Sequence, residues 1–318
     1  MQIGLIGLGR MGANIARRLM RHGHAVVAYD RTATSVSELA AAGGKPAKDI
    51  DALVQALAAP RAVWVMLPAG EATETTIERL GGMLAPGDTV IDGGNTFWKD
   101  DIRRARTLKA RGLHYIDVGT SGGVLGAESG YCLMIGGESD AVRRLAPVFA
   151  ALAPGGDMQA APATQGWLHV GGSGAGHFVK MVHNGIEYGL MQAYAEGFQL
   201  IAEADADNVP EAERLTLDTA QIAEVWRHGS IISSRLLDVI AAALAKDRSL
   251  KEFSGVVEDT GEGRWTVQAA IERAIPAMAL TTALNARFRS RRSANFADKL
   301  ISAMRRGFGG HVEPKGKP

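Results

Sequence analysis

Short apolar runs alternate with amphipathic segments along the first half of the chain. The runs that have the length and composition of buried strands occupy residues 2–6, 25–29, 62–67, 89–92 and 114–118. Between the runs, apolar residues recur at helical spacing, as Ile15, Leu19 and Met20 do after the first run. Strands that alternate with helices predict an α/β fold with a doubly wound, parallel sheet of the Rossmann type.

The pattern changes after residue 162. A glycine-rich stretch from 162 to 176 predicts a linker, and beyond it the apolar residues follow helical spacing almost throughout. The later helices are expected at Glu211–Trp226, Ser234–Lys246, Trp265–Phe288 and Ala294–Arg306. We therefore predict an α/β domain over residues 1–172, followed by an all-α domain over residues 173–318.

The helix that opens the second domain carries a polar stripe. Its members fall at positions i, i+3, i+4, i+7 and i+8 of one helix face, and they are Lys180, His183, Asn184, Glu187 and Tyr188. The positions between them are apolar, which suits the helix to burial. Burying an ammonium, a carboxylate and an imidazole without partners is costly, so we expect the stripe to line a polar pocket. A solvated face with one Lys–Glu ion pair is the alternative.

The first predicted strand leads directly into a glycine turn. Between this strand and the next helix stand Gly7, Leu8, Gly9, Arg10, Met11 and Gly12, in the context of a dinucleotide-binding turn. The glycines let a pyrophosphate approach the backbone at the helix N-terminus. The second strand ends at Asp30, whose carboxylate would accept hydrogen bonds from ribose hydroxyls and repel a 2′-phosphate. NAD is therefore favoured over NADP, although Arg31 would partly support NADP. A turn that binds no nucleotide is the alternative.

Two further loops follow predicted strands. One is Asp92-Gly-Gly-Asn95, and the other is the stretch 119–123 with Ser121 and two glycines at its end. The carboxyl ends of parallel strands form the ligand-binding edge of such a sheet. Small residues let a ligand approach the backbone, while Asn95 and Ser121 supply hydrogen bonds. Each loop alone could also be an ordinary turn.

The composition excludes several classes of function. Of the 318 residues, 46% are hydrophobic and 22% charged, as in ordinary globular proteins, and the net charge of +1 argues against a general polyanion binder. The single cysteine, Cys132, excludes an intramolecular disulfide, and no metal-binding spacing occurs. The basic cluster at 287–292 lacks aromatic stacking partners, so it indicates a solvated loop or an anion site rather than nucleic-acid binding. We expect a cytoplasmic protein without a signal peptide or membrane span.

Taken together, these motifs resemble the decarboxylating 6-phosphogluconate dehydrogenase family of the β-hydroxyacid dehydrogenase superfamily. The resemblance covers most of the chain and rests on the glycine turn, Asp92-Gly-Gly-Asn95, Ser121-Gly-Gly123, the stretch from Gly176 to Tyr188 and Glu224-Val-Trp-Arg. The length is similar to that of short family members, which lack the second helical block of longer ones. Lys180 and Asn184 are typical of the whole superfamily, whereas His183, Glu187 and Tyr188 are typical of this family.

The resemblance implies oxidative decarboxylation of 6-phospho-D-gluconate to D-ribulose 5-phosphate, a step of the pentose phosphate pathway, with NAD preferred and NADP weaker. Lys180 would accept the hydroxyl proton and then polarise the resulting keto group. Glu187 would protonate C1 of the enediol that decarboxylation leaves. The two residues lie two helical turns apart, about 10 Å along the axis, from which both can reach one substrate. No metal is implied.

The resemblance also implies residues that hold the substrate. The sugar acid would contact Asn95, Ser121, Gly122, Gly123, His183 and Asn184, of which Asn95 would also contact the cofactor. The phosphate would contact Tyr188, Arg264, Arg287 and Arg305. Arg264 stands where the family usually has lysine, so its reach and geometry differ.

The end of the chain resembles a family tail that completes a neighbouring subunit's site. In that tail an arginine is followed six positions later by a histidine, as Arg305 is by His311. The resemblance therefore implies a homodimer or homotetramer with active sites shared between subunits. A plain alternative is that Arg305 only belongs to a basic helix end, which the helix dipole favours.

Two other functions fit part of the pattern. One is a β-hydroxyacid dehydrogenase for an unphosphorylated 3-hydroxy acid, which would keep Lys180 and Asn184 but would have little use for the arginines. The other is a non-catalytic nucleotide-sensing module. Such a module has no need for a proton acceptor and donor such as Lys180 and Glu187 together.

Overall fold

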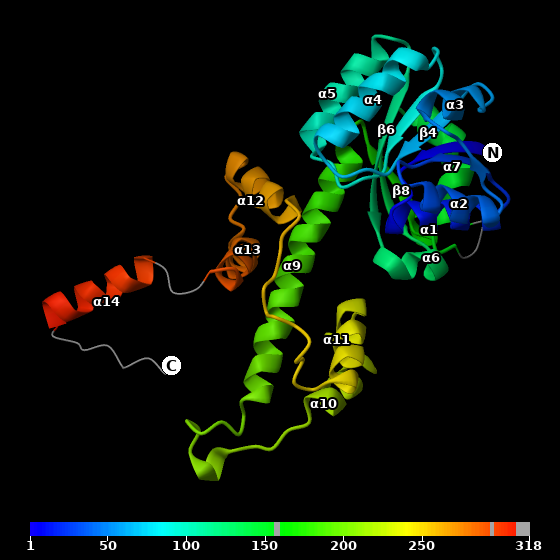
Figure 1. Cartoon of the computed structure of the whole chain (residues 1–318). Coiled ribbons are helices and arrows are strands. Elements are labelled where there is room, and N and C mark those ends of the chain that lie inside the picture. The colour runs from blue at the N-terminus through cyan, green and yellow to red at the C-terminus, as the bar shows by residue number, and fades with distance from the viewer. Residues whose placement is uncertain (156–159, 293–295, 310–318) are drawn as a thin grey trace. The chain divides into compact units, whose positions relative to one another are not determined.

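The computed structural model describes residues 1–155, 160–292 and 296–309, in two compact units, Met1–His183 and Asn184–Pro318. The strands are β1 Gln2–Ile6, β2 Ala25–Tyr29, β3 Lys45–Pro46, β4 Ala62–Val65, β5 Thr89–Asp92, β6 His114–Ser121, β7 Cys132–Gly137 and β8 Trp167–Gly171. The helices of the first unit are α1 Arg10–Arg21, α2 Ala33–Ala41, α3 Ile50–Gln55, α4 Glu71–Met83, α5 Trp98–Lys109, η1 Gly123–Leu125, α6 Gly126–Ser129, α7 Ser139–Leu152 and α8 Pro162–Gln165. Helix α9 Ala175–Ala202 continues from the first unit into the second (Figure 1). The second unit then contains η2 Glu211–Glu213, α10 Thr219–Arg227, α11 Arg235–Lys246, α12 Glu262–Glu272, α13 Met278–Ser290 and α14 Phe296–Gly309.

The strands form one sheet in the order β3-β2-β1-β4-β5-β6-β7-β8. Neighbouring strands are parallel except β6 and β7, which are antiparallel. The strand order reverses between β1 and β4, and open α/β sheets bind ligands at the carboxyl ends of the strands around such a switch point. Asp92 and Asp117 are paired across β5 and β6. Strand β5 ends at this pair, whereas β6 continues to Ser121, paired there with β7.

Helices cover the two faces of this sheet (Figure 1), and a layer of apolar side chains is buried on each face. Side chains of α1 and α7 pack on one face, and those of α3, α4 and α5 pack on the other. Successive residues of a strand point to opposite faces, so Leu5 of β1 joins the first layer and Ile6 joins the second. Burial on both faces explains why the strands read as continuous apolar runs in the sequence.

The first turn of α9 packs directly against β6 and β7. An ideal Cβ at Gly176 would lie 2.5 Å from the Met134 carbonyl oxygen, and one at Gly119 would lie 2.4 Å from Cβ of Lys180. Only glycine leaves room for two backbones at this distance. The contact places Lys180 beside the carboxyl-terminal half of β6.

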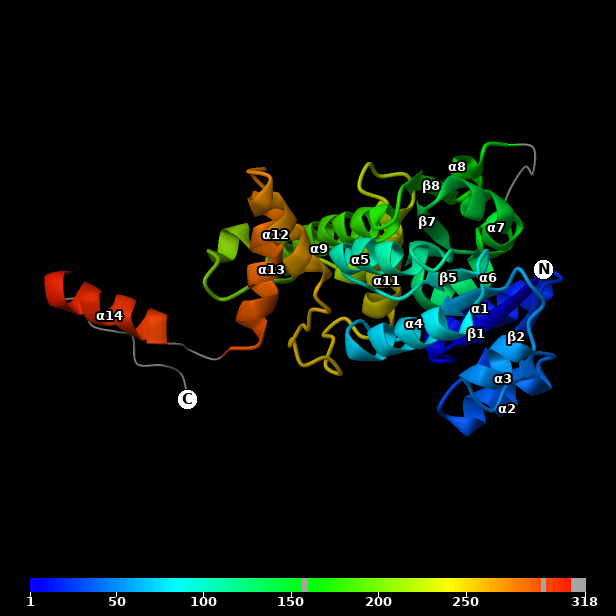
Figure 2. The ribbon, with the colours of Figure 1, turned by 90° about the horizontal axis from the view of Figure 1, so that it is seen from above.

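The second unit consists of helix pairs. Helix α10 packs on α11 (Figure 1), and α12 packs on α13 (Figure 2). Asp218 and Ser234 cap α10 and α11, because their side-chain oxygens accept backbone N–H bonds from the first helical turn. Among the described residues, no helix combines the length and the apolar character needed to cross a membrane.

The predicted fold class is confirmed, and the five predicted strands are present. The predicted linker at 162–176 is wrong, because this stretch contains α8 and β8, the edge strand of the sheet. The helix predicted at 265–288 is interrupted between α12 and α13, where Pro276 lacks the N–H group that a continuous helix needs. The helix predicted from residue 211 begins only at Thr219.

We expect Gly119→Ala to lower the free energy of unfolding by about 1–3 kcal/mol, because the added methyl group would overlap Lys180 and the Gly176 carbonyl oxygen. Urea unfolding followed by circular dichroism measures this change. The control is Gly82→Ala in α4, where no atom lies within 4 Å and alanine favours the helix. That variant should match or slightly exceed the parent. A Gly119→Ala variant as stable as the parent would contradict the close approach of α9.

Candidate functional site

The glycine turn after β1 has the geometry of a dinucleotide site. Gly7 has a φ of +98°, and an ideal Cβ at Gly12 would lie 2.0 Å from the Gly7 carbonyl oxygen. Gly9 is the N-cap of α1 and contributes no side chain to cap it. The N–H groups of the first turn can therefore bind a pyrophosphate. Of the residues between the glycines, Leu8 is buried and Arg10 is exposed.

Asp30 faces this turn from the end of β2. Its Oδ2 accepts the Leu8 N–H at 2.7 Å, and its Oδ1 accepts the Thr32 N–H at 2.7 Å. Burial alone would raise the pKa of Asp30, but the backbone N–H donors of Leu8 and Thr32 outweigh burial and lower it. The carboxylate is thus ionised and fixed beside the turn, while Arg31 next to it is exposed.

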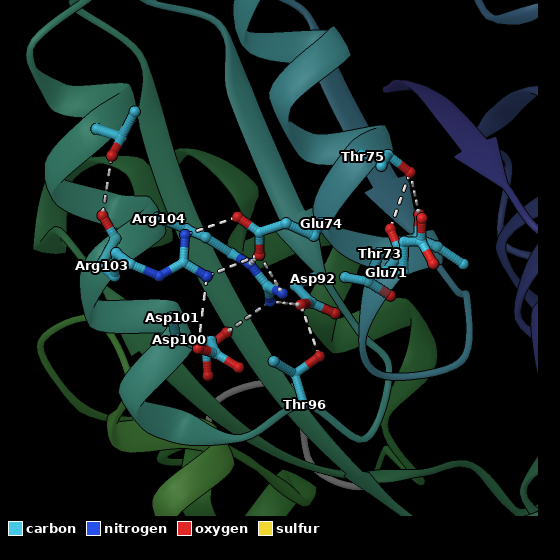
Figure 3. Close-up of polar contacts among 12 residues, drawn as sticks. Glu71, Thr73, Glu74, Thr75, Asp92, Thr96, Asp100, Asp101, Arg103 and Arg104 are labelled. Atoms are coloured by element: carbon cyan, nitrogen blue, oxygen red, sulfur yellow. Dashed lines mark hydrogen bonds and ion pairs between the residues drawn. The ribbon is translucent and has the colours of Figure 1, made fainter.

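The loop Asp92-Gly-Gly-Asn95 rests on a buried ionic network (Figure 3). Asp92 accepts the Gly94 N–H at 3.0 Å and the Thr96 hydroxyl at 2.8 Å, which closes the loop on itself. Nη1 of Arg104, from α5, donates to Oδ2 of Asp92 at 3.2 Å. With Asp92 and Arg104 buried beneath it, the loop presents Asn95 at its exposed tip.

The same network holds the first turn of α9. Asp117 of β6 accepts the backbone N–H groups of Gly174 at 2.7 Å and His177 at 2.9 Å. Asp101 of α5 binds Nδ1 of His177 at 2.8 Å and accepts the Tyr115 hydroxyl at 2.7 Å. Burial raises the pKa of Asp101 to about 6. Burial would lower the pKa of His177, but the Asp101 carboxylate dominates and raises it to about 10, so the two form an ion pair at neutral pH.

The side chains of Asp92, Asp101 and His177 have the chemistry of metal ligands. One ligand atom from each lies within 4.8 Å of the others, and all three residues are buried. Nη1 of Arg104 lies 3.2 Å from Asp92 and 3.9 Å from Asp101. The guanidinium thus supplies the positive charge that a metal ion would bring to these carboxylates. We therefore interpret these buried side chains as a structural support for the Asp92–Asn95 loop and for α9.

Three predicted site residues come together in the first unit. Nζ of Lys180 lies 3.4 Å from Nδ1 of His183, and Nε2 of His183 lies 3.2 Å from Oγ of Ser121. Lys180 is 8% exposed. Strand β6 continues to Ser121, so the predicted loop begins only at Gly122, and both Gly122 and Gly123 are exposed.

Tyr188 and two arginines come together in the second unit. Cζ of Arg287 lies 3.6 Å from the centroid of the Tyr188 ring. Arg264 is bound to Asp259 through Nε at 2.7 Å and Nη2 at 3.0 Å. Asn184 and Glu187 are half-buried on α9. Arg305 is exposed on α14, and His311 lies outside the described residues.

Sequence reasoning missed the residues that support the site. These are Asp101, Arg104, Asp117, His177 and Asp259. For His177 a signal was present, because it lies three positions before Lys180 and so extends the polar stripe of α9 by one turn. Asp117 interrupts an apolar strand, which is a second signal. The sequence gives no comparable sign for Asp101, since it lies among other charged residues of an amphipathic helix.

Profiles of one family match both halves of the chain. The NAD binding domain of 6-phosphogluconate dehydrogenase matches residues 2–164, and the 6-phosphogluconate dehydrogenase C-terminal domain matches residues 176–213 and 193–313. The chain belongs to the 6-phosphogluconate dehydrogenase family. The resemblance inferred from the sequence motifs is thereby confirmed, while the roles of single site residues stay predictions.

Relatives within the 6-phosphogluconate dehydrogenase family differ in length. The NAD(+)-dependent, decarboxylating 6-phosphogluconate dehydrogenase of Haloferax volcanii is 42% identical over 98% of this chain and 98% of its own length. The enzyme of the same name from Bacillus subtilis is 36% identical over 91% of this chain and 61% of its own length. The solved structure of the Plasmodium falciparum 6-phosphogluconate dehydrogenase has a TM-score of 0.79 at 28% identity, covering 100% of this chain and 67% of that one.

The ion pairs of Glu74 predict how stability depends on pH. Glu74 binds Arg103 at 2.6 Å and Arg104 at 2.8 Å, and the hydrogen bonds, above all that of Arg103, lower its pKa from 4.5 to about 2. A carboxylate with a lowered pKa stabilises the fold fully above its unfolded-state value and loses this contribution as the pH falls through its folded-state value. The unfolding free energy should therefore fall between about pH 5.5 and about pH 3.5, and fall less in Glu74→Gln.

Urea unfolding of both proteins at the two pH values measures this difference. Glu71→Gln is the matched control, because it makes the same change on an exposed side chain of α4. It should keep the pH dependence of the parent. If Glu74→Gln also kept the pH dependence of the parent, the ion pairs of Glu74 would not contribute to stability between these two pH values.

Proposed function

We propose that this chain oxidises and decarboxylates 6-phospho-D-gluconate to D-ribulose 5-phosphate and CO2 with NAD, a step of the pentose phosphate pathway. The Haloferax volcanii relative, which is named for this activity, matches nearly the full length of both chains. The observation that carries the proposal is the buried Lys180 in contact with His183, which itself contacts Ser121. A lysine that is nearly buried and has polar neighbours is better suited to proton transfer than to a charge interaction on the protein surface.

The residues around the glycine turn fit NAD. The turn at Gly7–Gly12 and the first turn of α1 would hold the pyrophosphate, and Asp30 would hold the ribose hydroxyls. Bound NAD supplies the acceptor for the hydride that leaves C3 of the substrate. The ionised Asp30 would lie where NADP carries its 2′-phosphate, so NADP binds less well.

Lys180 acts first as a base. Its neutral Nζ accepts the proton of the C3 hydroxyl while the hydride leaves the same carbon, which turns C3 into a ketone. The contact with His183 orients the amine, and the position of Lys180 at 8% exposure limits competition from water. The product of this step is a β-keto acid with its carboxylate on C1.

The protonated Lys180 then acts as an acid. It donates a hydrogen bond to the C3 oxygen, so the electron pair of the breaking C1–C2 bond can move toward the ketone as CO2 leaves. An enediol remains, and its terminal carbon becomes C1 of ribulose 5-phosphate. Glu187, on the same helix, donates the proton to that carbon. Asn95, Ser121, His183 and Asn184 would hold the hydroxyl and carboxyl groups during both steps.

The phosphate of the substrate would bind in the second unit. Tyr188, Arg264 and Arg287 supply a hydroxyl and two guanidinium groups, and guanidinium groups bind phosphate oxygens bidentately. A substrate without phosphate would leave these cations unused. This difference favours a phosphorylated sugar acid over a small 3-hydroxy acid.

The active site is proposed to be shared between subunits of a homodimer or homotetramer. Helix α14 carries Arg305, and its residues Phe296, Leu300 and Met304 are 77%, 46% and 51% exposed. They recur every four residues, so they form one apolar helix face, of the kind that protein interfaces bury. Arg305 and His311 would then contact the substrate of the neighbouring subunit. A cytoplasmic location stays a prediction from the sequence.

The test of the function is the initial rate of NADH and NADPH formation from 6-phosphogluconate, with CO2 release followed in the same sample. We expect CO2 in a one-to-one ratio to reduced cofactor, faster with NAD, and no comparable rate with gluconate. Lys180→Ala should lower kcat by about 1,000-fold or more while NADH still binds, because the proton acceptor is lost but the cofactor site is intact. Lys109→Ala, an exposed lysine of α5, is the matched control and should keep full activity. Retained turnover in Lys180→Ala would exclude the mechanism.

Asp30→Asn tests the cofactor preference. Asparagine has one acceptor oxygen, so it keeps the hydrogen bond from only one of the two backbone N–H groups, those of Leu8 and Thr32, and it removes the charge that repels a 2′-phosphate. The ratio of kcat/KM for NAD to that for NADP should fall by about tenfold. An unchanged ratio would show that Asp30 does not face the ribose.

A further inference from the structure

The second unit contains an arginine to which the family resemblance assigns no role. Arg291 follows α13 directly, one helical turn after Arg287. Cζ of Arg291 lies 5.4 Å from the centroid of the Phe288 ring, and Cζ of Arg264 lies 4.5 Å from the same centroid. Three guanidinium groups, those of Arg264, Arg287 and Arg291, therefore gather around Phe288 and Tyr188.

Asp259 joins two of these guanidinium groups. Its side chain is 2% exposed, and it binds Arg264 through both oxygens and Arg291 through Oδ2 at 2.8 Å. The hydrogen bonds from Arg264, followed by those from Arg291, lower the pKa of Asp259 to about 2. The carboxylate is therefore ionised throughout the neutral range. In this trio of Asp259, Arg264 and Arg291, Arg291 also binds the carboxylate of Glu258 through Nη1 at 2.9 Å, and the Glu258 side chain is 76% exposed.

The shared oxygen limits the distance between the two guanidinium groups. Nη2 of Arg264 and Nη2 of Arg291 lie 3.0 Å and 2.8 Å from the same Oδ2 of Asp259. The two nitrogens can be no further apart than the sum of these distances, which is within the span that a single phosphate group can bridge. A guanidinium has five N–H donors, so binding Asp259 does not exhaust Arg264, and binding both Asp259 and Glu258 does not exhaust Arg291.

The surroundings place the trio next to Tyr188. An ideal Cβ at Gly263 would lie 2.6 Å from the Tyr188 ring, so the first turn of α12 rests against that ring and Arg264 follows immediately. Arg287 stacks on the ring and donates from Nη1 to the Glu258 carbonyl oxygen at 2.8 Å. The residues proposed to bind the phosphate thus adjoin Asp259 and Arg291 in sequence and in space.

We propose that Arg291 is a further binding residue for the phosphate of the substrate, and that Asp259 is the positioning residue that holds Arg264 and Arg291 side by side. This inference rests on the proposed function, because it assumes that the ligand carries a phosphate. Holding two long side chains in place before the ligand arrives reduces the entropy lost on binding. Arg291 is thereby a determinant of specificity for phosphorylated over unphosphorylated sugar acids.

A purely structural role of Arg291, or a purely electrostatic role of Asp259, would give different results when the residue is replaced. If Arg291 only attached the loop at 254–261 to α13, its loss would lower stability and kcat together. If Asp259 acted only through its charge, its removal would strengthen phosphate binding, because a carboxylate repels phosphate. The positioning role predicts the opposite sign, since Arg264 and Arg291 would lose their common partner.

Steady-state kinetics separate these roles. Arg291→Gln should raise KM for 6-phosphogluconate by about 10- to 100-fold while kcat and KM for NAD change little, as expected for the loss of a charge-assisted hydrogen bond. Arg291→Lys should recover part of the affinity. Asp259→Asn should also raise KM for 6-phosphogluconate. Arg289→Gln is the matched control, because it removes the same charge from an exposed position in the last turn of α13, and it should keep the parent KM.

Inorganic phosphate is a second probe that does not depend on turnover. It should raise the thermal unfolding temperature of the parent and of Arg289→Gln, and raise it much less for Arg291→Gln. If 6-phosphogluconate were not a substrate but phosphate gave this pattern, the proposed function would fail and the anion site would stand. An unchanged KM in Arg291→Gln, a parallel loss of kcat, or tighter substrate binding in Asp259→Asn would overturn the inference.

Discussion

The geometry of the candidate active site depends on the carboxylates that hold the first turn of α9. Asp117 accepts two backbone N–H groups there, and Asp101 binds the His177 side chain of the same turn. The first N–H groups of a helix have no partner within the helix, so a carboxylate satisfies them and interacts favourably with the helix dipole. Lys180 lies one turn further along α9. Its position is therefore set through the backbone as well as through its contact with His183.

Burying so many charges opposes folding, which indicates that the network serves geometry more than stability. Asp92 of β5, Asp101 of α5 and Asp117 of β6 are fully buried, and their partners are Arg104, backbone N–H groups and a protonated His177. Buried ion pairs are often no more stabilising than apolar side chains of the same volume. Here, however, one network reaches the Asp92–Asn95 loop, α5 and α9. A substitution or shift in one of these elements would leave a buried charge on another element without its partner. The three elements are therefore held in fixed positions relative to one another.

Much of the fold could be predicted from the sequence, because its signals are local. The glycine turn, the five buried strands and the polar stripe of α9 each show themselves within about a dozen residues. Strands β7 and β8 escaped prediction because their surroundings are rich in glycine, and glycine serves close packing there: an ideal Cβ at Gly136 would lie 2.5 Å from Oδ1 of Asp117. Gly176, which lies in the predicted linker, is likewise needed where α9 meets the sheet.

The supporting part of the site was less predictable, because it depends on pairs that are distant in sequence. Asp101 and His177 are 76 positions apart, and Asp259 and Arg291 are 32 apart, so neither pair leaves a spacing pattern. Apart from His177, which extends the polar stripe of α9, the residues of these pairs look like ordinary surface charges of amphipathic helices or loops. Their partners become evident only when burial and distance are known together.

Arg264 stands where the resemblance to the family implies a lysine, and the buried Asp259 bears on what a lysine would do at this position. A lysine ammonium is a compact point charge and cannot occupy both oxygens of Asp259 in one plane, as the guanidinium of Arg264 does. With a lysine at 264, Asp259 would depend on Arg291 for its remaining hydrogen bonds, and the buried carboxylate would be poorly compensated. Arg264, Asp259 and Arg291 are therefore one coupled set. In this set, the arginine at position 264 is needed to balance the charge of Asp259 as much as to bind a ligand.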